Sequence, residues 1–210
     1  MPVALDAHPD LARLEGARPS RVADAVSAVG EPGHLVILTL VVVSVTSTAS
    51  LLSALGWVVL TTVFCVGLPS IALRILIARG LVLDRHVVVR EQRTVPLLVA
   101  LASVATGLGL LVLLSAPRPV VALVAAMLAG AIPMSVVSRW YKASFHVGVA
   151  GGTAVILVLV LGPWWVAVVT PLLLVVGWAR VRAGRHTVGQ VLVGAGLGCA
   201  AAAVVFPWLA

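Results

Sequence analysis

Seven long apolar stretches follow one another from residue 35 to the end of the chain, separated by short polar or proline- and glycine-containing breaks. A helix that crosses a membrane needs about 20 mostly apolar residues, with a lower limit near 17. The pattern therefore predicts membrane-spanning helices at residues 35–55, 57–78, 96–115, 119–138, 144–161, 163–179 and 187–208. The stretch 144–161 is short and glycine-rich, so the expected fold is an all-α integral membrane protein with a bundle of six or seven transmembrane helices.

Residues 1–34 have a different pattern, with five acids and three bases. The stretch DLARLEGARPSRVADAVSAVG starts at Asp10, a possible N-cap, and carries apolar residues at helical intervals. It predicts an amphipathic segment resting on the membrane surface, with an unstructured tail as the alternative. Two regions are thus expected, an amphipathic N-terminal segment at 1–34 and a helical membrane domain at 35–210.

The composition supports a membrane protein and excludes several other classes. Of the 210 residues, 61% are hydrophobic and only 10% are charged, whereas a soluble domain has about a quarter charged residues. The formal net charge of +7 does not indicate nucleic-acid binding, because the bases lie between hydrophobic stretches without interleaved aromatic residues. Cys65 and Cys199 lie inside apolar stretches without metal-ligand spacing, which favours a packing role.

The polar residues of the membrane domain are concentrated in three loops. RGLVLDRHVVVREQRTVP follows the second expected span, SRWYK the fourth and RVRAGRH the sixth. Two spans separate each of these loops from the next, so all three must emerge on the same face of the membrane. From residue 35 onward the chain has eleven bases but only two acids, Asp84 and Glu91. This set predicts an anion-binding site without a metal or other cofactor, since hard divalent cations require several carboxylate or carbonyl oxygens.

The third loop and the following span contain candidate residues for nucleophilic chemistry on a phosphoryl group. Arg180 closes the sixth span, and its guanidinium can bind two phosphoryl oxygens at once. If a helix begins near His186, then Gln190 lies one turn further on the same face. The oxygen of Gln190 can then accept a hydrogen bond from one imidazole nitrogen of His186 and leave the other nitrogen as a nucleophile.

The second loop supplies a complementary group of residues. Ser144 can cap the fifth span, whose first turn offers free backbone amides to an anion. Lys142 adds positive charge, and His146 can carry a proton to a departing oxygen. The two loops together predict two walls of one pocket.

These patterns resemble the type 2 phosphatidic acid phosphatase superfamily, membrane phosphatases related to vanadium haloperoxidases. The family's third motif, Ser-Arg-x5-His-x3-Asp, is similar to Ala179-Arg180, His186 and Gln190, in a variant with His-Thr-x-x-Gln. Its second motif, Pro-Ser-Gly-His, is similar to Ala143-Ser144-Phe145-His146. Its first motif, Lys-x6-Arg-Pro, is matched only loosely by REQRTVP, which contains Arg90 and Arg93. The similarity covers about residues 79–200, and the motifs occur in the family's order.

The resemblance implies a two-step, metal-independent phosphoryl transfer. In it, His186 attacks phosphorus to form a phosphohistidine, and His146 protonates the leaving group. The implied phosphate-binding residues are Arg180, Lys142, Ser144, Arg93 and Arg90. Gln190 stands where the family has Asp, and a neutral amide orients an imidazole without stabilising an imidazolium as a carboxylate would.

Three alternatives limit this interpretation. Basic residues at span ends commonly anchor the chain on the cytoplasmic side, and we assign that role to Arg74, Arg79, Arg182 and Arg185. A prenyltransferase would need Asp-rich magnesium motifs, which the loops lack. A catalytically weakened member that acts as a phospholipid-binding scaffold or transporter stays open, because of Gln190 and the degraded first motif.

The expected substrate is a membrane lipid or polyprenyl phosphate or diphosphate, because the spans leave no soluble domain to enclose a polar molecule. The distribution of basic residues predicts a multi-pass protein of the plasma membrane with the active-site face toward the cytoplasm. The bilayer and its phosphate-bearing lipids are the expected partners, and nucleic acid is not.

Overall fold

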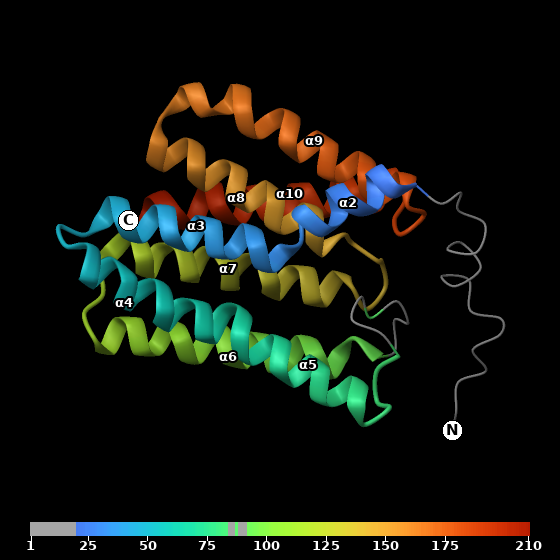
Figure 1. The fold of residues 1–210 in the computed structure, drawn as a ribbon, viewed down its shortest axis with the longest axis horizontal. Helices are drawn as coiled ribbons and strands as arrows, with labels where there is room; N and C mark the ends of the chain where they lie inside the picture. Colours follow the sequence, from blue (N-terminus) through green and yellow to red (C-terminus); the bar gives the residue numbers. More distant parts are fainter. Residues whose placement is uncertain (1–19, 84–86, 88–91) are drawn as a thin grey trace.

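The computed structural model describes residues 20–83, 87 and 92–210, and every regular element in these residues is helical (Figure 1). The elements are α2 (Arg21–Val29), α3 (Pro32–Ser47), α4 (Leu51–Thr62), η2 (Val63–Gly67), α5 (Leu68–Ala78), α6 (Thr94–Leu113), α7 (Arg118–Val137), α8 (Phe145–Leu161), η4 (Pro163–Trp165), α9 (Val166–Arg182) and α10 (Val188–Leu209). In the described residues, six helical segments are long and apolar enough to cross a membrane, the first being Arg21–Ser47, which comprises α2 and α3, and α8 adds a shorter apolar helix. This confirms the predicted all-α bundle of six or seven membrane helices.

The first membrane helix begins and ends earlier than the hydrophobic pattern predicts. It starts at Pro32, a favoured first residue of a helix, and it ends at Ser47 rather than at residue 55. The break lies in a Ser- and Thr-rich stretch, where Thr48 is extended with φ −129° and ψ 144°. The Thr48 hydroxyl donates a hydrogen bond to the Ser44 carbonyl at 2.8 Å. Ser and Thr hydroxyls form hydrogen bonds to nearby backbone carbonyls in competition with the helical N–H groups. A hydropathy pattern does not reveal a helix end of this kind.

The second membrane helix is continuous from α4 through α5 but contains the π-helical turn η2. Pro69 follows this turn and has no N–H to donate to the preceding turn of helix. The hydroxyl of Ser103 on α6 donates to the Phe64 carbonyl at 2.6 Å. A widened turn next to a proline therefore keeps the helix continuous, while α6 satisfies one of its carbonyls.

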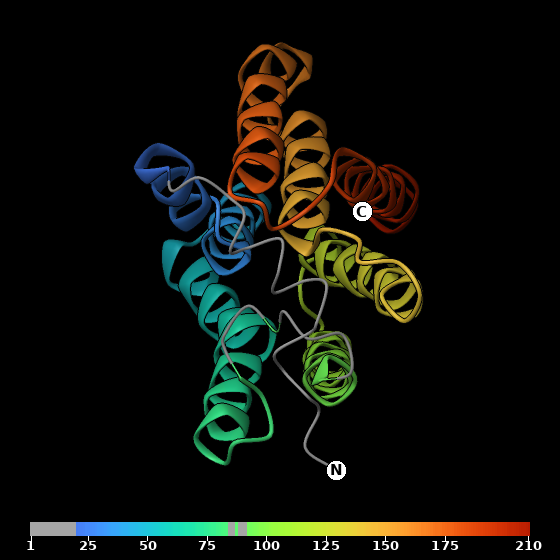
Figure 2. The same ribbon diagram turned by 90° about the vertical axis from the view of Figure 1, so that its right-hand side faces the viewer.

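The bundle has a central group of helices with one flank on each side. Helices α7, α8 and α10 pack together, α9 and α2 lie on one side of them, and α4–α5 with α6 lie on the other (Figures 1 and 2). The last residues of α5, α7 and α9 and the first residues of α6, α8 and α10 lie at the same end of the bundle (Figure 1), as the two spans between successive basic loops predicted. The interior of the opposite half of the bundle is filled by fully buried side chains, namely Leu40, Val43, Leu111, Val120 and Val124.

Helix α2 packs against α9 and buries Ala23 and Ser27, while Val22 and Val29 stay exposed. Its N-cap is Ser20, whose hydroxyl accepts a hydrogen bond from the Ala23 N–H at 3.3 Å. The expected cap at Asp10 lies outside the described residues. The described part of the N-terminal segment is therefore a short helix that rests on the bundle next to the end of α9.

Glycines allow α8 and α10 to approach each other at backbone distance. A Cβ atom on Gly198 would overlap the Gly148 carbonyl, and one on Gly194 would overlap the Ser144 carbonyl. The sequence GAGLG thus provides close helix packing, because only glycine leaves room for the facing backbone.

We expect Gly198→Ala to lower the melting temperature of the detergent-solubilised protein, by an amount corresponding to about 1–3 kcal/mol of overpacking. Gly196→Ala is the matched control, because a Cβ there meets nothing within 4 Å and alanine is the better helix former. Its melting temperature should stay equal or rise. Equal melting temperatures for Gly198→Ala and the unsubstituted protein would contradict the packing described here.

Candidate functional site

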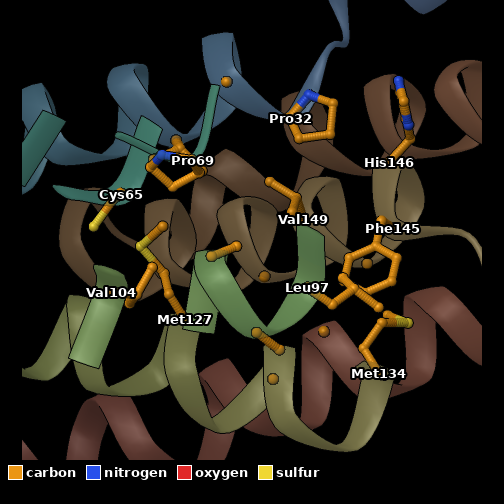
Figure 3. Close-up of a pocket in the computed structure, with 18 of the residues that line it drawn as sticks. Pro32, Cys65, Pro69, Leu97, Val104, Met127, Met134, Phe145, His146 and Val149 are labelled. Atoms are coloured by element: carbon orange, nitrogen blue, oxygen red, sulfur yellow. The ribbon is translucent and has the colours of Figure 1, made fainter. Parts of the chain in front are cut away.

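A cavity of about 500 Å³ begins at the loop end of the bundle and continues between the helices (Figure 3). Five of the predicted site residues line it, and they come from three separate parts of the chain: Arg93, Lys142, His146, Arg180 and His186. Ser144 and Gln190 lie next to this wall as buried residues at the starts of α8 and α10. The predicted Arg90 lies outside the described residues. The fold thus brings residues from the first, second and third motifs to one cavity.

The turn after α9 folds Arg185 and His186 back against Arg180. Gly184 has a φ of +66°, a left-handed conformation that ends the helix at low cost. The N–H of Gly184 donates to the Val181 carbonyl at 3.0 Å, and the N–H of Arg185 donates to the Arg180 carbonyl at 3.2 Å. This pair of bonds is a Schellman C-cap. The N–H of His186 also donates to the Arg180 carbonyl at 3.2 Å. The cap therefore keeps Arg185 and His186 next to Arg180 within one turn of the chain.

The imidazole of His186 is oriented by the backbone of the opposite loop. Its Nδ1 lies 3.3 Å from the Lys142 carbonyl oxygen, which can only accept, so Nδ1 carries the proton. In the neutral ring, Nε2 is then the nitrogen with a free lone pair. The Gln190 side chain also contributes a hydrogen bond to His186, but its Oε1 additionally accepts the Thr187 N–H at 3.1 Å in a capping box. The Lys142 carbonyl is therefore an orienting group that the sequence analysis did not predict, and the orienting role of Gln190 stays a prediction.

The surroundings of His186 keep its ring neutral. Burial lowers the pKa of His186 to about 3, helped by the charges of Arg180 and Lys142, while the hydrogen bonds to the Lys142 backbone and the Gln190 side chain act in the opposite direction. An unperturbed histidine has a pKa of about 6.5 and would be partly protonated at neutral pH. His186 is thus a neutral base next to fixed positive charges, as a nucleophile toward a phosphate requires.

Ser144 joins the second motif to the third. It is the N-cap residue of α8, as predicted, and its N–H donates to the Gln190 carbonyl at 3.0 Å. Its hydroxyl does not make the expected capping hydrogen bond. The Ser144 Oγ is instead buried with no partner in the described part of the chain. The start of α8 is therefore seated on the start of α10, with one hydroxyl left available.

Several buried donors near the cavity mouth have no hydrogen-bond partner among residues 20–83, 87 and 92–210. Arg180 is only 3% exposed, and its Nε and Nη1 are unpaired. The same holds for Arg185 Nε, Ser138 Oγ and Ser144 Oγ. Buried polar groups are almost always paired, so these donors are available to an acceptor that enters the cavity. An anion with several oxygens would satisfy these donors.

Arg185, Ser138 and Glu31 also line the cavity, although they were not among the predicted site residues. Arg185 lines the cavity with a buried Nε, which differs from the anchor role that the sequence analysis assigned to it. Ser138 lines the cavity at the end of α7. Glu31, at the N-cap of α3, is the one carboxylate among the described lining residues. The position of Arg185 directly before His186 does not distinguish it from an anchoring arginine, and nothing local marks Ser138 or Glu31.

Within the described residues, no group of three or more His, Cys, Asp and Glu side chains could hold a metal ion. The cavity wall is instead cationic and rich in hydrogen-bond donors near the loops. Such a wall can bind phosphoryl oxygens and stabilise the charge that develops on them.

Comparison with known proteins agrees with this geometry. The PAP2 superfamily model matches residues 93–210, a region that includes Arg93 and both histidines of the cavity. No curated protein and no solved structure matched the chain. Since the family match covers more than half of the 210 residues, this multi-pass membrane protein belongs to the PAP2 superfamily and has a phosphatase-type function.

Proposed function

We propose that the protein is a metal-independent phosphohydrolase that removes phosphate from a membrane lipid or polyprenyl phosphate or diphosphate through a phosphohistidine. The observation that carries this proposal is the neutral His186 beside the buried, unpaired donors of Arg180 on one cavity wall. A neutral imidazole supplies the nucleophile, and the guanidinium supplies the charge that a phosphoryl group needs during transfer.

In the first step, the lone pair on His186 Nε2 attacks phosphorus and the bond to the leaving oxygen breaks. His146 gives a proton to that oxygen, so an alcohol or a monophosphate departs. In the second step, His146 takes a proton from a water that attacks the phosphohistidine, which releases inorganic phosphate and restores both histidines. Arg93, Lys142, Arg180 and Ser144 hold the phosphoryl oxygens in both steps, and Arg90 is a further candidate for that role.

One contact supports activity of the proposed third motif in its His-Thr-x-x-Gln form, His186 to Gln190. The hydrogen bond from His186 Nδ1 to the Lys142 carbonyl orients the ring without a carboxylate. A neutral amide at Gln190 stabilises the imidazolium character of the phosphohistidine less than a carboxylate would. We therefore propose that the enzyme favours substrates with a good leaving group, such as diphosphates.

The site opens at the end of the bundle where Arg74, Arg79 and Arg182 also lie on the adjoining helices. An excess of arginine on one side of a membrane protein is typical of the cytoplasmic side. We therefore propose that the reaction takes place at the cytoplasmic face of the plasma membrane.

The test is a phosphate-release assay with purified protein in EDTA. We expect release from at least one member of a panel of phosphatidate, prenyl phosphates and prenyl diphosphates, and an acid-labile phosphoenzyme after brief incubation with a ³²P-labelled substrate. His146→Ala should lower the rate of phosphate release, because His146 acts as the acid of the first step and as the base of the second. Tight phosphate binding without any release would contradict the proposal and favour a binding scaffold or transporter.

A further inference from the structure

The cavity extends far beyond the charged wall that the proposed chemistry uses. On α7 its lining runs from Ser138, the C-cap, to Leu123, which is about 22 Å at the rise of an α-helix. On α8 it runs from His146 to Ile156, about 15 Å. Ala202 on α10 lines the same cavity and lies about 18 Å along its helix from Gln190. The three helices therefore give similar values for the depth of the cavity. This depth is half or more of the thickness of the hydrocarbon core of a bilayer, which is about 30 Å.

The deep part of the cavity is apolar and has a closed floor. Leu123, Ile156 and Ala202 are 1%, 3% and 2% exposed and belong to the main hydrophobic cluster. Beyond them the bundle is sealed by the fully buried Leu40, Val43, Leu111, Val120 and Val124. Figure 3 shows Cys65, Val104 and Met127 around the deep end, whereas Phe145 and His146 lie toward the mouth.

Two hydroxyls of the cavity lining, those of Thr39 and Thr153, form a hydrogen bond with each other. Thr39 Oγ1 donates to the Leu35 carbonyl at 2.7 Å, so Thr153 donates to Thr39 across a distance of 3.0 Å. With these groups paired, the deep part offers water few partners, and apolar cavities of this kind do not hold ordered water. An apolar chain is the occupant that its lining favours.

We propose that this deep part, named here the tail chamber, holds one hydrocarbon chain of the substrate and limits its length through Leu123, Ile156 and Ala202. The inference rests on the proposed function, because it takes the occupant to be the tail of the molecule whose phosphate meets Arg180 and His186. Continuity favours this occupant over an unrelated bilayer lipid, since one cavity contains both the cationic wall and the apolar floor.

The size of the chamber limits the length of the hydrocarbon chain that it can hold. An extended carbon chain advances about 1.2 Å per bond, as an extended polypeptide backbone does, so a depth of about 15–22 Å accepts about 12–18 bonds. The whole cavity, including the space beside the charged wall, has a volume of about 500 Å³, so it holds at most about 16 groups of the size of a water molecule, at about 30 Å³ each. Both estimates describe a single alkyl chain or a short prenyl chain rather than two acyl chains or a long polyprenyl chain.

Photolabelling tests the chamber without turnover. Hexadecyl phosphonate with a diazirine at the chain end should label the floor of the full-length protein, on the segments of α7 and α10 that contain Leu123 and Ala202. Octyl phosphonate with the same diazirine at its chain end should label residues nearer the mouth of the cavity, around Ala131, because its chain ends about 10 Å below the phosphonate. Inorganic phosphate in excess should reduce both labels. Labelling confined to lipid-facing residues, or the same labelled site for both probes, would overturn the proposal.

A steric variant tests the length limit. Ala202→Phe should lower the rate ratio of hexadecyl to octyl phosphate hydrolysis by about tenfold or more, because the ring fills the floor. Ala203→Phe is the matched control, since Ala203 is the next residue on α10 and is exposed to lipid. An unchanged ratio in Ala202→Phe would overturn the length limit.

The two proposals fail in different ways. Floor labelling without phosphate release from any substrate would leave the chamber and remove the proposed function. Phosphate release without floor labelling would leave the function and remove the chamber.

Discussion

Replacement of His186 by Asn is expected to abolish phosphate release, with a loss of at least about 10³-fold in kcat. Asparagine is polar and keeps a donor that can reach the Lys142 carbonyl, but it has no lone-pair nitrogen to attack phosphorus. The measurement is phosphate release in EDTA from the best substrate of the panel, together with the ³²P label on the protein. Both signals should be lost, while the melting temperature in detergent stays close to that of the unsubstituted protein.

His34→Asn is the matched control for this experiment. His34 is exposed, its Nδ1 lies 3.1 Å from the Ala28 carbonyl, and it is absent from the cavity wall. An exposed substitution of this kind typically changes stability by less than about 0.5 kcal/mol, so activity should be kept within about twofold. If His186→Asn retained more than a tenth of the activity, His186 would not be the nucleophile.

Arg180→Lys is expected to lower kcat/KM by about 10²-fold although the positive charge is kept. Lysine places a single ammonium where the guanidinium offers several donors in a fixed plane, and two of those donors are buried and unpaired in the structure. Removal of a well-placed donor to a developing oxyanion typically costs about 10²–10³-fold. Steady-state kinetics and the inhibition constant of inorganic phosphate measure the effect, and the inhibition constant should rise as well.

Arg182→Lys provides the matched control, because it is the same substitution two residues further along α9. Arg182 is exposed and does not line the cavity, so kcat/KM should change by less than about twofold. Equal effects of the two substitutions would show that only the net charge of this end of the bundle matters, and that Arg180 has no specific contact with phosphate.

The helix boundaries are the first feature of the fold that the hydrophobic pattern did not predict correctly. Thr48 and its neighbours interrupt an otherwise apolar stretch by hydrogen bonding to the backbone, so the first helix ends at Ser47. The π-helical turn at η2 depends on Pro69 together with Ser103 from another helix. A hydropathy pattern reports where residues are apolar, but it does not report which carbonyl a hydroxyl on a distant helix will satisfy.

The candidate site likewise contains some residues that the sequence could suggest and others that it could not. Arg180 with His186, and Lys142 with His146, could be proposed as site residues from the sequence, because the members of each pair are close together in the chain. Arg185 could not be separated from an anchoring arginine, since its role depends on the turn at Gly184 that points it back to the cavity. The Lys142 carbonyl could not be identified at all, because a backbone group has no signature in the sequence.

By itself, the sequence determined that this chain crosses the membrane several times and gathers its basic loops on one face. Those properties follow from the length and order of apolar stretches, which act locally and add along the chain. Only the tertiary structure decided which groups meet in one cavity, which of the arginine donors stay unpaired, and how deep the apolar chamber reaches. These features depend on the packing of helices from distant parts of the chain, above all the backbone contact between Gly198 and Gly148.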